Sequence, residues 1–108
     1  MTECIFCKII ENTIPAQIIT QTDSLIVIKD IAPKAPTHYL IIPKKHIVDL
    51  REFSHEDLEL GTKIISMAQQ LSRDLNNYPF KLVISNGHEA GQRVFHLHAH
   101  FLAWTPLK

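Results

Sequence analysis

The pattern of apolar and polar residues along the chain predicts five β-strands separated by turns. Asp23 and Ser24 stand between two runs rich in β-branched residues, an arrangement typical of a hairpin. The segment 30–36 contains two prolines, so we expect a rigid loop there that leads into the third strand. The expected strands are 18–22, 25–29, 38–42, 80–85 and 96–103.

A short helix is expected near the start of the chain. Apolar residues recur there at three- and four-residue spacing, which places them on one side of a helix that must end before Pro15. These residues are Ile5, Phe6, Ile9 and Ile10. The helix would cap another part of the fold with this apolar side.

A long helix is expected in the centre of the chain. Ser54 and Asp57 form a capping-box pattern at its start, and the asparagines 76–77 end it after about twenty residues of helical periodicity. The expected apolar stripe consists of Leu58, Gly61, Ile64, Ile65, Ala68, Leu71 and Leu75. This stripe would cover a sheet, and strands joined by hairpins favour an α+β fold with an antiparallel sheet.

Length and charge narrow the class of protein. The chain has 108 residues and no internal repeat, which indicates a single domain, 1–108. Eleven basic and eleven acidic side chains give a formal net charge of zero, which argues against nucleic acid or a membrane surface as partner. The apolar runs, such as 39–42, are too short to span a bilayer, and Met1–Thr2–Glu3–Cys4 does not begin an export signal. We therefore expect a cytoplasmic protein.

Histidine is the unusual residue in the composition, with seven copies. In the segment 96–102, His96, His98 and His100 alternate with apolar residues, which would place all three imidazoles on one face of a strand. At about 3.3 Å per residue, the first and third lie roughly 13 Å apart, too far for one tetrahedral ion to bind all three. The plainer interpretation is a half-buried strand with polar outward positions. A row of imidazoles also offers a nucleophile, a proton donor and a ligand near neutral pH.

A glycine-containing loop, 86–94, comes directly before this row. Gly87 and Gly91 permit tight turns and a close approach of the backbone, so N–H groups of the loop could hold phosphate oxygens. An ordinary turn is the alternative interpretation. The position of the loop beside the histidines favours the phosphate site.

On these motifs the chain resembles the histidine triad (HIT) family of nucleotide hydrolases and transferases, and within it the Hint-type phosphoramidase branch. The match covers nearly the whole chain, and its most specific part is the alternation of histidine with apolar residues that ends in two apolar positions. The matching segments are 4–10, 14–16, 30–33, 38–46, 90–92 and 94–100.

The resemblance implies a catalytic role for four histidines. His98 would attack the α-phosphorus and form a transient nucleotidyl-histidine, from which water releases the nucleoside monophosphate. His100 and His38 would orient the nucleophile and stabilise charge, and His96 would support it from two residues away. The amides of Gln92 and Val94, with the Gln92 side chain, would hold phosphate oxygens.

The resemblance also implies how the nucleoside binds. Asp30 would accept hydrogen bonds from both ribose hydroxyls. The apolar walls around a purine would be Ile5, Phe6, Ile9, Ile28, Ile31 and Leu40, although plain core packing explains such residues equally well. Gly91, in the matching segment 90–92, would also belong to the nucleotide-binding site. Two other positions depart from the family pattern. Ser85 stands where relatives commonly have Asn, so its phosphate contact would weaken or pass to Asn86, and Arg93 would favour anionic over lysine-like leaving groups.

Cys4 and Cys7 form a C-x-x-C motif, which supplies half of a tetrahedral zinc shell. The resemblance to the zinc-binding subgroup implies that His46 and His96 complete a structural Zn²⁺ site. Two buried thiols or a redox pair are the alternatives, although no βαβ pattern surrounds the motif.

The function expected from these features is hydrolysis of purine nucleoside phosphoramidates or related adenylated compounds, without an organic cofactor. The resemblance implies a homodimer with a continuous sheet. Two alternatives share the same pocket: cleavage of dinucleoside polyphosphates, and a nucleotide-binding interaction module with little turnover.

Overall fold

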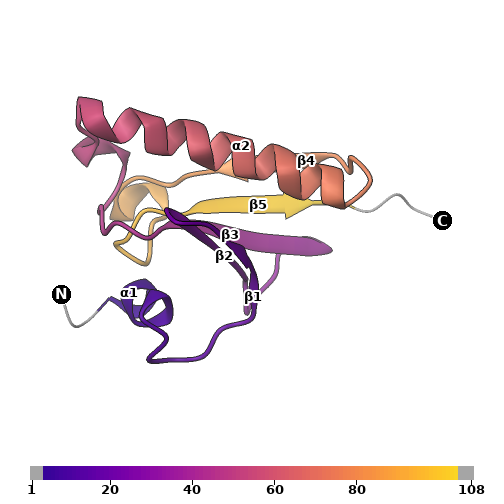
Figure 1. Cartoon of the computed structure of the whole chain (residues 1–108), viewed down its shortest axis with the longest axis horizontal. Coiled ribbons are helices and arrows are strands. Elements are labelled where there is room, and N and C mark those ends of the chain that lie inside the picture. The colour runs from indigo at the N-terminus through magenta and orange to yellow at the C-terminus, as the bar shows by residue number, and fades with distance from the viewer. Residues whose placement is uncertain (1–3, 105–108) are drawn as a thin grey trace.

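The computed structural model describes residues 4–104 and consists of one antiparallel sheet with a helix against each face (Figure 1). Helix α2 (Leu58–Asp74) covers one face, and helix α1 (Ile5–Ile10) lies on the other. The strand order is β1-β2-β3-β5-β4, and every neighbouring pair is antiparallel. The strands are β1 (Ile18–Gln21), β2 (Leu25–Lys29), β3 (Thr37–Pro43), β4 (Phe80–Val83) and β5 (Ala99–Ala103).

This architecture confirms the expected α+β class with one long and one short helix. None of the helices between Cys4 and Trp104 is long and apolar enough to cross a membrane. Residues 1–3, on which the expectation about an export signal rests in part, lie outside the described residues.

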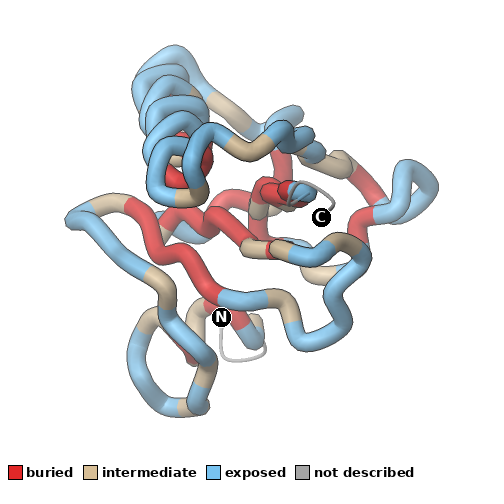
Figure 2. The backbone as a smooth tube through the Cα atoms, turned by 90° about the vertical axis from the view of Figure 1, so that its right-hand side faces the viewer, coloured by how far each residue is buried: buried red, intermediate tan, exposed pale blue. Residues whose placement is uncertain are grey.

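The two faces of the sheet bury two separate apolar clusters because side chains alternate along each strand. On β2, Leu25 and Val27 point toward α2, whereas Ile26 and Ile28 point toward α1. Figure 2 shows buried backbone running through the middle of the molecule, between exposed outer segments. The histidines of the row therefore fall on the α1 side, because Leu97, Ala99 and Phe101 belong to the cluster under α2.

The long helix begins with a capping box, as the sequence predicts. In this capping box, the side chains of Ser54 and Asp57 each pair with the backbone N–H of the other residue. Asp57 also accepts a hydrogen bond from Lys45 Nζ at 2.7 Å. The first turn, His55–Asp57, is a 3₁₀ turn, so α2 itself starts at Leu58. The helix ends at Asp74, and Leu75 packs against the core just beyond it.

The expected apolar stripe of α2 is wrong at two positions. Ile64, Ala68 and Leu71 are buried against the sheet, but Leu58 is 56% exposed and Ile65 is 60% exposed. One helix surface cannot turn both members of the pair 64–65 toward a flat sheet, because adjacent residues lie about 100° apart around the axis. The stripe is therefore narrower than the sequence pattern indicated.

Strand β5 begins at Ala99, three residues later than predicted. In the register with β3, Ile41 stands opposite Ala99, so Leu97 would stand opposite Pro43, which has no N–H to give to the ladder. Leu97 N–H instead donates to the carbonyl of Ile47 at 2.7 Å. His96 and His98 therefore lie in an irregular segment rather than in the strand, and β4, predicted to reach Ser85, ends at Val83.

The pair 64–65 gives a direct test of the core. We expect Ile64→Ala to lower the free energy of unfolding by about 2–5 kcal/mol, because a 1% exposed side chain leaves a cavity under α2. Ile65→Ala, the matched control, should change it by less than about 1 kcal/mol. Urea denaturation at low micromolar protein measures both values, and equal losses would contradict the assignment of the stripe.

Candidate functional site

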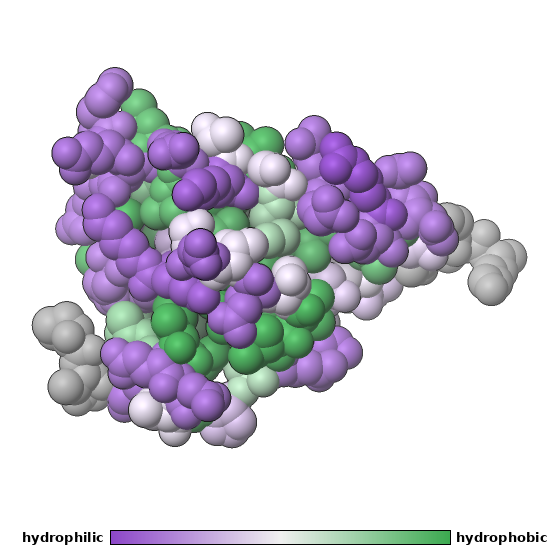
Figure 3. Space-filling view, viewed as in Figure 1, coloured by the Kyte–Doolittle hydropathy of each residue, from purple (hydrophilic) through white to green (hydrophobic). Residues whose placement is uncertain are grey.

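A cavity of about 690 Å³ opens on the α1 side of the sheet, between α1, the loop after β2 and the segment 91–94. In Figure 3, hydrophobic surface gathers near α1 with hydrophilic residues around it. All six expected apolar walls line the cavity: Ile5, Phe6, Ile9, Ile28, Ile31 and Leu40. Four of them are buried, whereas Ile5 and the fully exposed Ile31 stand at the rim.

Six of the residues expected to act in catalysis or to bind the phosphate and the ribose also line this cavity: Asp30, Gly91, Arg93, Val94, His98 and His100. The structure adds Lys29 and Lys34, which the sequence analysis did not assign to the site, and the segment 14–17. Nothing in the spacing of these lysines distinguishes them from surface lysines. The segment 14–17 includes the matched motif 14–16, but no pocket role was assigned to it.

His98 is held in one tautomer by the backbone. Its Nδ1 lies 2.8 Å from the carbonyl oxygen of His96, and a carbonyl only accepts, so Nδ1 carries the hydrogen. The lone pair of the neutral ring is therefore on Nε2. Because His98 lines the cavity, the ring offers this site an unprotonated nitrogen, the form of imidazole that acts as a nucleophile.

His38 and His100 form a second ordered pair. His38 Nδ1 accepts a hydrogen bond from the backbone N–H of Lys34 at 3.1 Å, so the hydrogen of its neutral ring is on Nε2. That Nε2 lies 2.9 Å from His100 Nδ1 and 3.3 Å from Asp30 Oδ2. His100 Nδ1 must then accept, which leaves its hydrogen on Nε2. His98 and His100 therefore have opposite tautomers: Nε2 of His98 is a hydrogen-bond acceptor, whereas Nε2 of His100 is a donor.

Burial keeps these rings neutral. Desolvation lowers the pKa of His98 and of His38 from the usual value of 6.5, although Asp30 opposes the shift at both rings. The pKa of His100 falls to about 4 because burial and the neighbouring rings of His98 and His38 all disfavour its charged form. Near pH 7 the cavity therefore holds neutral imidazoles.

The loop 86–94 is braced by Gln92, which differs from the expected role of this residue. Gln92 is 1% exposed, its Oε1 accepts from Gly87 N–H at 2.8 Å, and its Nε2 donates to the carbonyls of Val48 and Val94. Its own backbone N–H donates to Gly87. Gln92 therefore has no hydrogen left for a phosphate, whereas Val94 N–H makes no hydrogen bond within residues 4–104 and stays available.

Ser85 and Asn86 are not among the residues that line the cavity, and their expected phosphate contacts stay predictions. Asn86 Oδ1 accepts from Leu50 N–H at 2.7 Å, and its Nδ2 donates to the Ile84 carbonyl, so its side chain fastens the loop to the 3₁₀ turn Leu50–Glu52. Gly91 adopts φ +105°, which favours glycine there.

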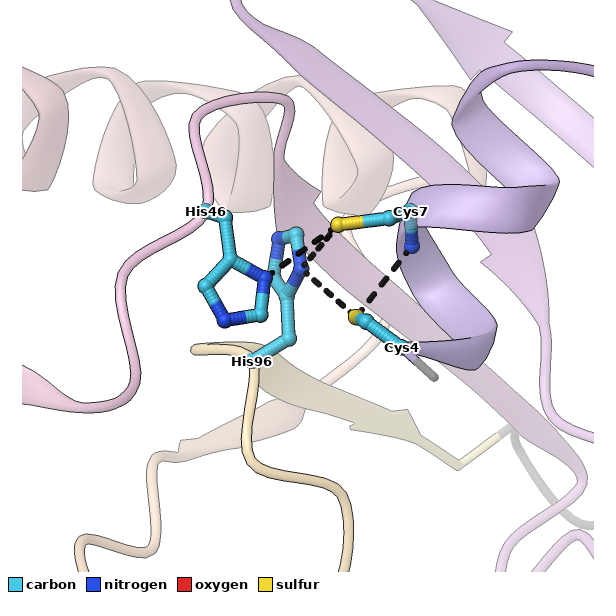
Figure 4. A group of neighbouring side chains, drawn as sticks. All are labelled: Cys4, Cys7, His46 and His96. Carbon is cyan, nitrogen blue, oxygen red and sulfur yellow. Dashed lines mark hydrogen bonds between the residues drawn. The ribbon is translucent and has the colours of Figure 1, made fainter. Parts of the chain in front are cut away.

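A second group of side chains lies beside the cavity and fits a metal ion (Figure 4). Cys4 and Cys7 come from the start of α1, His46 follows β3, and His96 precedes β5, and their ligand atoms all lie within 4.8 Å of one another. Cys4 Sγ is 3.3 Å from His96 Nδ1, and Cys7 Sγ is 3.2 Å from His46 Nδ1. Sulfur and nitrogen bound to one tetrahedral zinc lie about 3.6 Å apart, so little movement is needed.

The tautomer of His96 also suits a metal. His96 Nε2 lies 2.7 Å from the Pro43 carbonyl and so carries the hydrogen, which leaves the Nδ1 lone pair directed at the two sulfurs. Without an ion, burial and the adjacent Cys4 raise the pKa of the Cys7 thiol to about 11. His96 does not line the cavity, so it supports His98 through its carbonyl rather than acting on a ligand there.

Asp30, His38 and His100 also lie close enough together for a metal. His38, however, has its hydrogen on Nε2, the atom that would have to coordinate. This group is therefore organised as a hydrogen-bonded network, in contrast to the group of Cys4, Cys7, His46 and His96.

Comparison with known proteins agrees with the fold. The family model described as scavenger mRNA decapping enzyme C-term binding matches residues 3–106. An uncharacterized HIT-like protein of Synechocystis sp. is 43% identical over 105 residues, which cover 96% of this chain and 92% of that protein. The chain belongs to the HIT family.

Solved structures of HIT proteins superpose closely on the chain. A HIT family hydrolase from Clostridium thermocellum has a TM-score of 0.92 at 37% identity, with 100% of this chain and 96% of that chain covered. A zinc-bound histidine triad family protein from Mycobacterium smegmatis has a TM-score of 0.85 at 29% identity, with 96% and 76% covered.

The tautomers can be observed directly. We expect ¹⁵N NMR at pH 7 to find the hydrogen on Nδ1 of His98 and on Nε2 of His100, with both rings neutral. On acidification both should titrate below pH 6.5, His100 near pH 4. Because the unfolded chain takes up these protons at higher pH than the folded chain, stability should fall as the pH drops from about 6.5 toward 4. A charged His98 at pH 7 would contradict the assignment.

Proposed function

We propose that the protein hydrolyses purine nucleoside phosphoramidates and related adenylated compounds at the α-phosphate. One observation carries the proposal: His98 presents the lone pair of Nε2 to the cavity, because its Nδ1–H is fixed on the His96 carbonyl. Neutral imidazole is nucleophilic, and its burial keeps it neutral near pH 7. The membership of the chain in the HIT family supports the same chemistry.

The reaction has two displacements. His98 Nε2 attacks phosphorus, the bond from phosphorus to the leaving nitrogen breaks, and that nitrogen takes the electron pair and a proton from solvent. Water then attacks the phosphorus of the nucleotidyl-histidine and gives up a proton to solvent. The bond to Nε2 breaks, its electron pair returns to His98, and the nucleoside monophosphate leaves. The Val94 N–H and the Nε2–H of His100 are the donors suited to charge on the phosphate oxygens.

The remaining walls of the cavity suit the nucleoside. Phe6, Ile9, Ile28 and Leu40 form a buried apolar surface on which a purine can lie. Asp30 Oδ1 already accepts from Ala32 N–H at 2.8 Å, and each carboxylate oxygen can accept a second hydrogen bond. We propose that ribose hydroxyls take these positions.

Dinucleoside polyphosphates are a second candidate substrate class. Three cations, Lys29, Lys34 and Arg93, line the cavity, against one carboxylate, Asp30. This imbalance favours a ligand with more than one negative charge. Rates on adenosine 5′-phosphoramidate and diadenosine polyphosphates, measured side by side, distinguish the two classes, and negligible turnover of both would favour a nucleotide-binding module.

We propose that the group of Cys4, Cys7, His46 and His96 binds a structural Zn²⁺. Two sulfurs and two imidazole nitrogens are a donor set that zinc takes, and four protein ligands leave no position for substrate. When bound, zinc would join the start of α1 to the segment before β5. The thiols must be reduced for this, which fits our proposal of a cytoplasmic location.

We propose a homodimer in which two β4 strands pair and extend the sheet. β4 is at one edge of the sheet and exposes Phe80 and Val83, each at 38%. The other edge, β1, has an irregular register between Ile18 and Thr20, and such irregularities hinder pairing with a further strand. The exposed apolar strand is therefore the better interface.

Replacement of His98 tests the proposed mechanism. We expect His98→Ala to lower turnover of adenosine 5′-phosphoramidate more than about 1,000-fold while mononucleotide affinity stays within roughly tenfold, since the nucleophile acts mainly in the chemical step. Steady-state rates and calorimetric binding measure the two effects. Free imidazole should restore part of the turnover of His98→Gly, and near wild-type turnover by His98→Ala would rule out the covalent route.

Metal analysis tests the zinc site. Protein purified under reducing conditions without chelator should carry about one zinc per chain, and His46→Ala should lower this content and the melting temperature. His55→Ala, at another exposed histidine, is the matched control and should keep both. Zinc-free wild-type protein, measured by elemental analysis, would remove the proposal without affecting that for His98.

A further inference from the structure

A second cavity of about 510 Å³ borders the first. The proposed zinc ligands Cys4 and His46 line part of it, and the proposed hydrolysis assigns no role to its other walls. The two cavities share three lining residues, Ile5, Arg93 and Val94, so they adjoin at these side chains. The second cavity is a groove whose other walls include Val48 and the 47% exposed Phe95. The groove therefore begins where the proposed phosphate position, at Val94 N–H, ends.

The lining of the groove selects the chemistry of its occupant. Its walls are mainly the aliphatic and aromatic side chains of Ile5, Val48, Val94 and Phe95, and no acidic side chain lines it. Along these apolar walls a polyphosphate chain would lose hydration, and Arg93 is the one cationic side chain of the lining that could offset the loss. A hydrophobic group, in contrast, gains free energy in proportion to the apolar surface that it buries there.

Arg93 supplies the one guanidinium of the groove. Its Nη1 donates to the carbonyls of His88 and Gln92 at 2.9 and 3.1 Å, which fixes the direction of the side chain. Within the described residues it forms no ion pair with a carboxylate. The neighbouring Gln92 is buried and fully hydrogen-bonded, so the backbone that carries Arg93 is anchored too. The guanidinium is thus positioned at the junction of the two cavities with its charge uncompensated.

We propose that this groove is the leaving-group subsite and that Arg93 is its specificity-determining residue, selecting a hydrophobic amino acid that is linked to phosphorus through its amine and carries a free carboxylate. The proposal rests on the proposed hydrolysis of phosphoramidates. The apolar side chain of the amino acid would lie on Val48 and Phe95, and its carboxylate would pair with Arg93. When the bond from phosphorus to nitrogen breaks, the amino acid leaves with a protonated amine.

The test compares substrates that differ only in the leaving group, with zinc-loaded protein because Cys4 and His46 border the groove. The substrates are adenosine 5′-phosphoramidates of phenylalanine, phenylalanine methyl ester, glycine and lysine, with unsubstituted adenosine 5′-phosphoramidate as reference. We expect kcat/KM for the phenylalanine acid to exceed that for its ester by at least about tenfold, as suits a charge-assisted contact. Phenylalanine should also exceed glycine and lysine.

Two variants separate the two parts of the subsite. Arg93→Gln should reduce the ratio of acid to ester to about one, and Arg73→Gln on α2 is the matched control that should leave it unchanged. Val48→Ala should lower the ratio of phenylalanine to glycine about three- to tenfold, because its side chain lines the groove while its carbonyl still holds Gln92.

The ratios also separate failure of this proposal from failure of the proposed function. If the reference phosphoramidate is hydrolysed with dependence on His98, but the acid and the ester react equally in wild-type protein and in Arg93→Gln, the subsite is wrong and the function stands. The subsite proposal would also be overturned if the lysine phosphoramidate were preferred to the phenylalanine one, or if diadenosine polyphosphates were preferred to every phosphoramidate. If no phosphoramidate is hydrolysed, the proposed function itself fails.

Discussion

The hydrogen bond from His98 Nδ1–H to the carbonyl of His96 is the interaction on which the site depends. It determines which nitrogen of the ring is free, and it requires the carbonyl of His96 to point at a ring two residues later. An extended strand would not hold this arrangement, because its carbonyls point toward neighbouring strands. The departure of residues 96–98 from the β5 ladder, imposed by Pro43, therefore places the backbone acceptor beside the proposed nucleophile.

The side chain of His96 holds that backbone in place from its other side. Its ring lies between the Pro43 carbonyl and the two sulfurs of α1, so strand β3, helix α1 and the segment before β5 meet at one residue. Phe6, on the same helix, packs edge-on against both His96 and His98, with ring centroids 5.8 and 5.0 Å apart. A wall of the cavity and two of the four proposed metal ligands, Cys4 and Cys7, thus belong to one short helix and its N-cap. Occupancy of the metal site would consequently affect the shape of the cavity.

Burial sets the electrostatics of the same region. The imidazoles of His38, His96, His98 and His100 lie in this region. Desolvation lowers the pKa of each, and at His96 and His100 repulsion from neighbouring rings lowers it further. Neutral rings then need a definite hydrogen position, which the backbone groups of His96, Lys34 and Pro43 supply. The cationic side chains of the site belong to Lys29, Lys34 and Arg93, which line the cavity. The proposed nucleophile and the proposed binding of phosphate charge therefore use different residue types, histidine for the first and lysine or arginine for the second.

The sequence by itself determined the features that depend on local periodicity. The alternation in 96–102 places the histidines on the face opposite Leu97, Ala99 and Phe101, and the Ser54–Asp57 capping box starts the long helix, because side-chain direction and capping follow from neighbouring residues. Tertiary structure alone decided which polar groups stay free. Gln92 is occupied by Gly87, Val48 and Val94, and Ile65 faces outward, because such outcomes depend on residues that the fold brings together from distant parts of the chain.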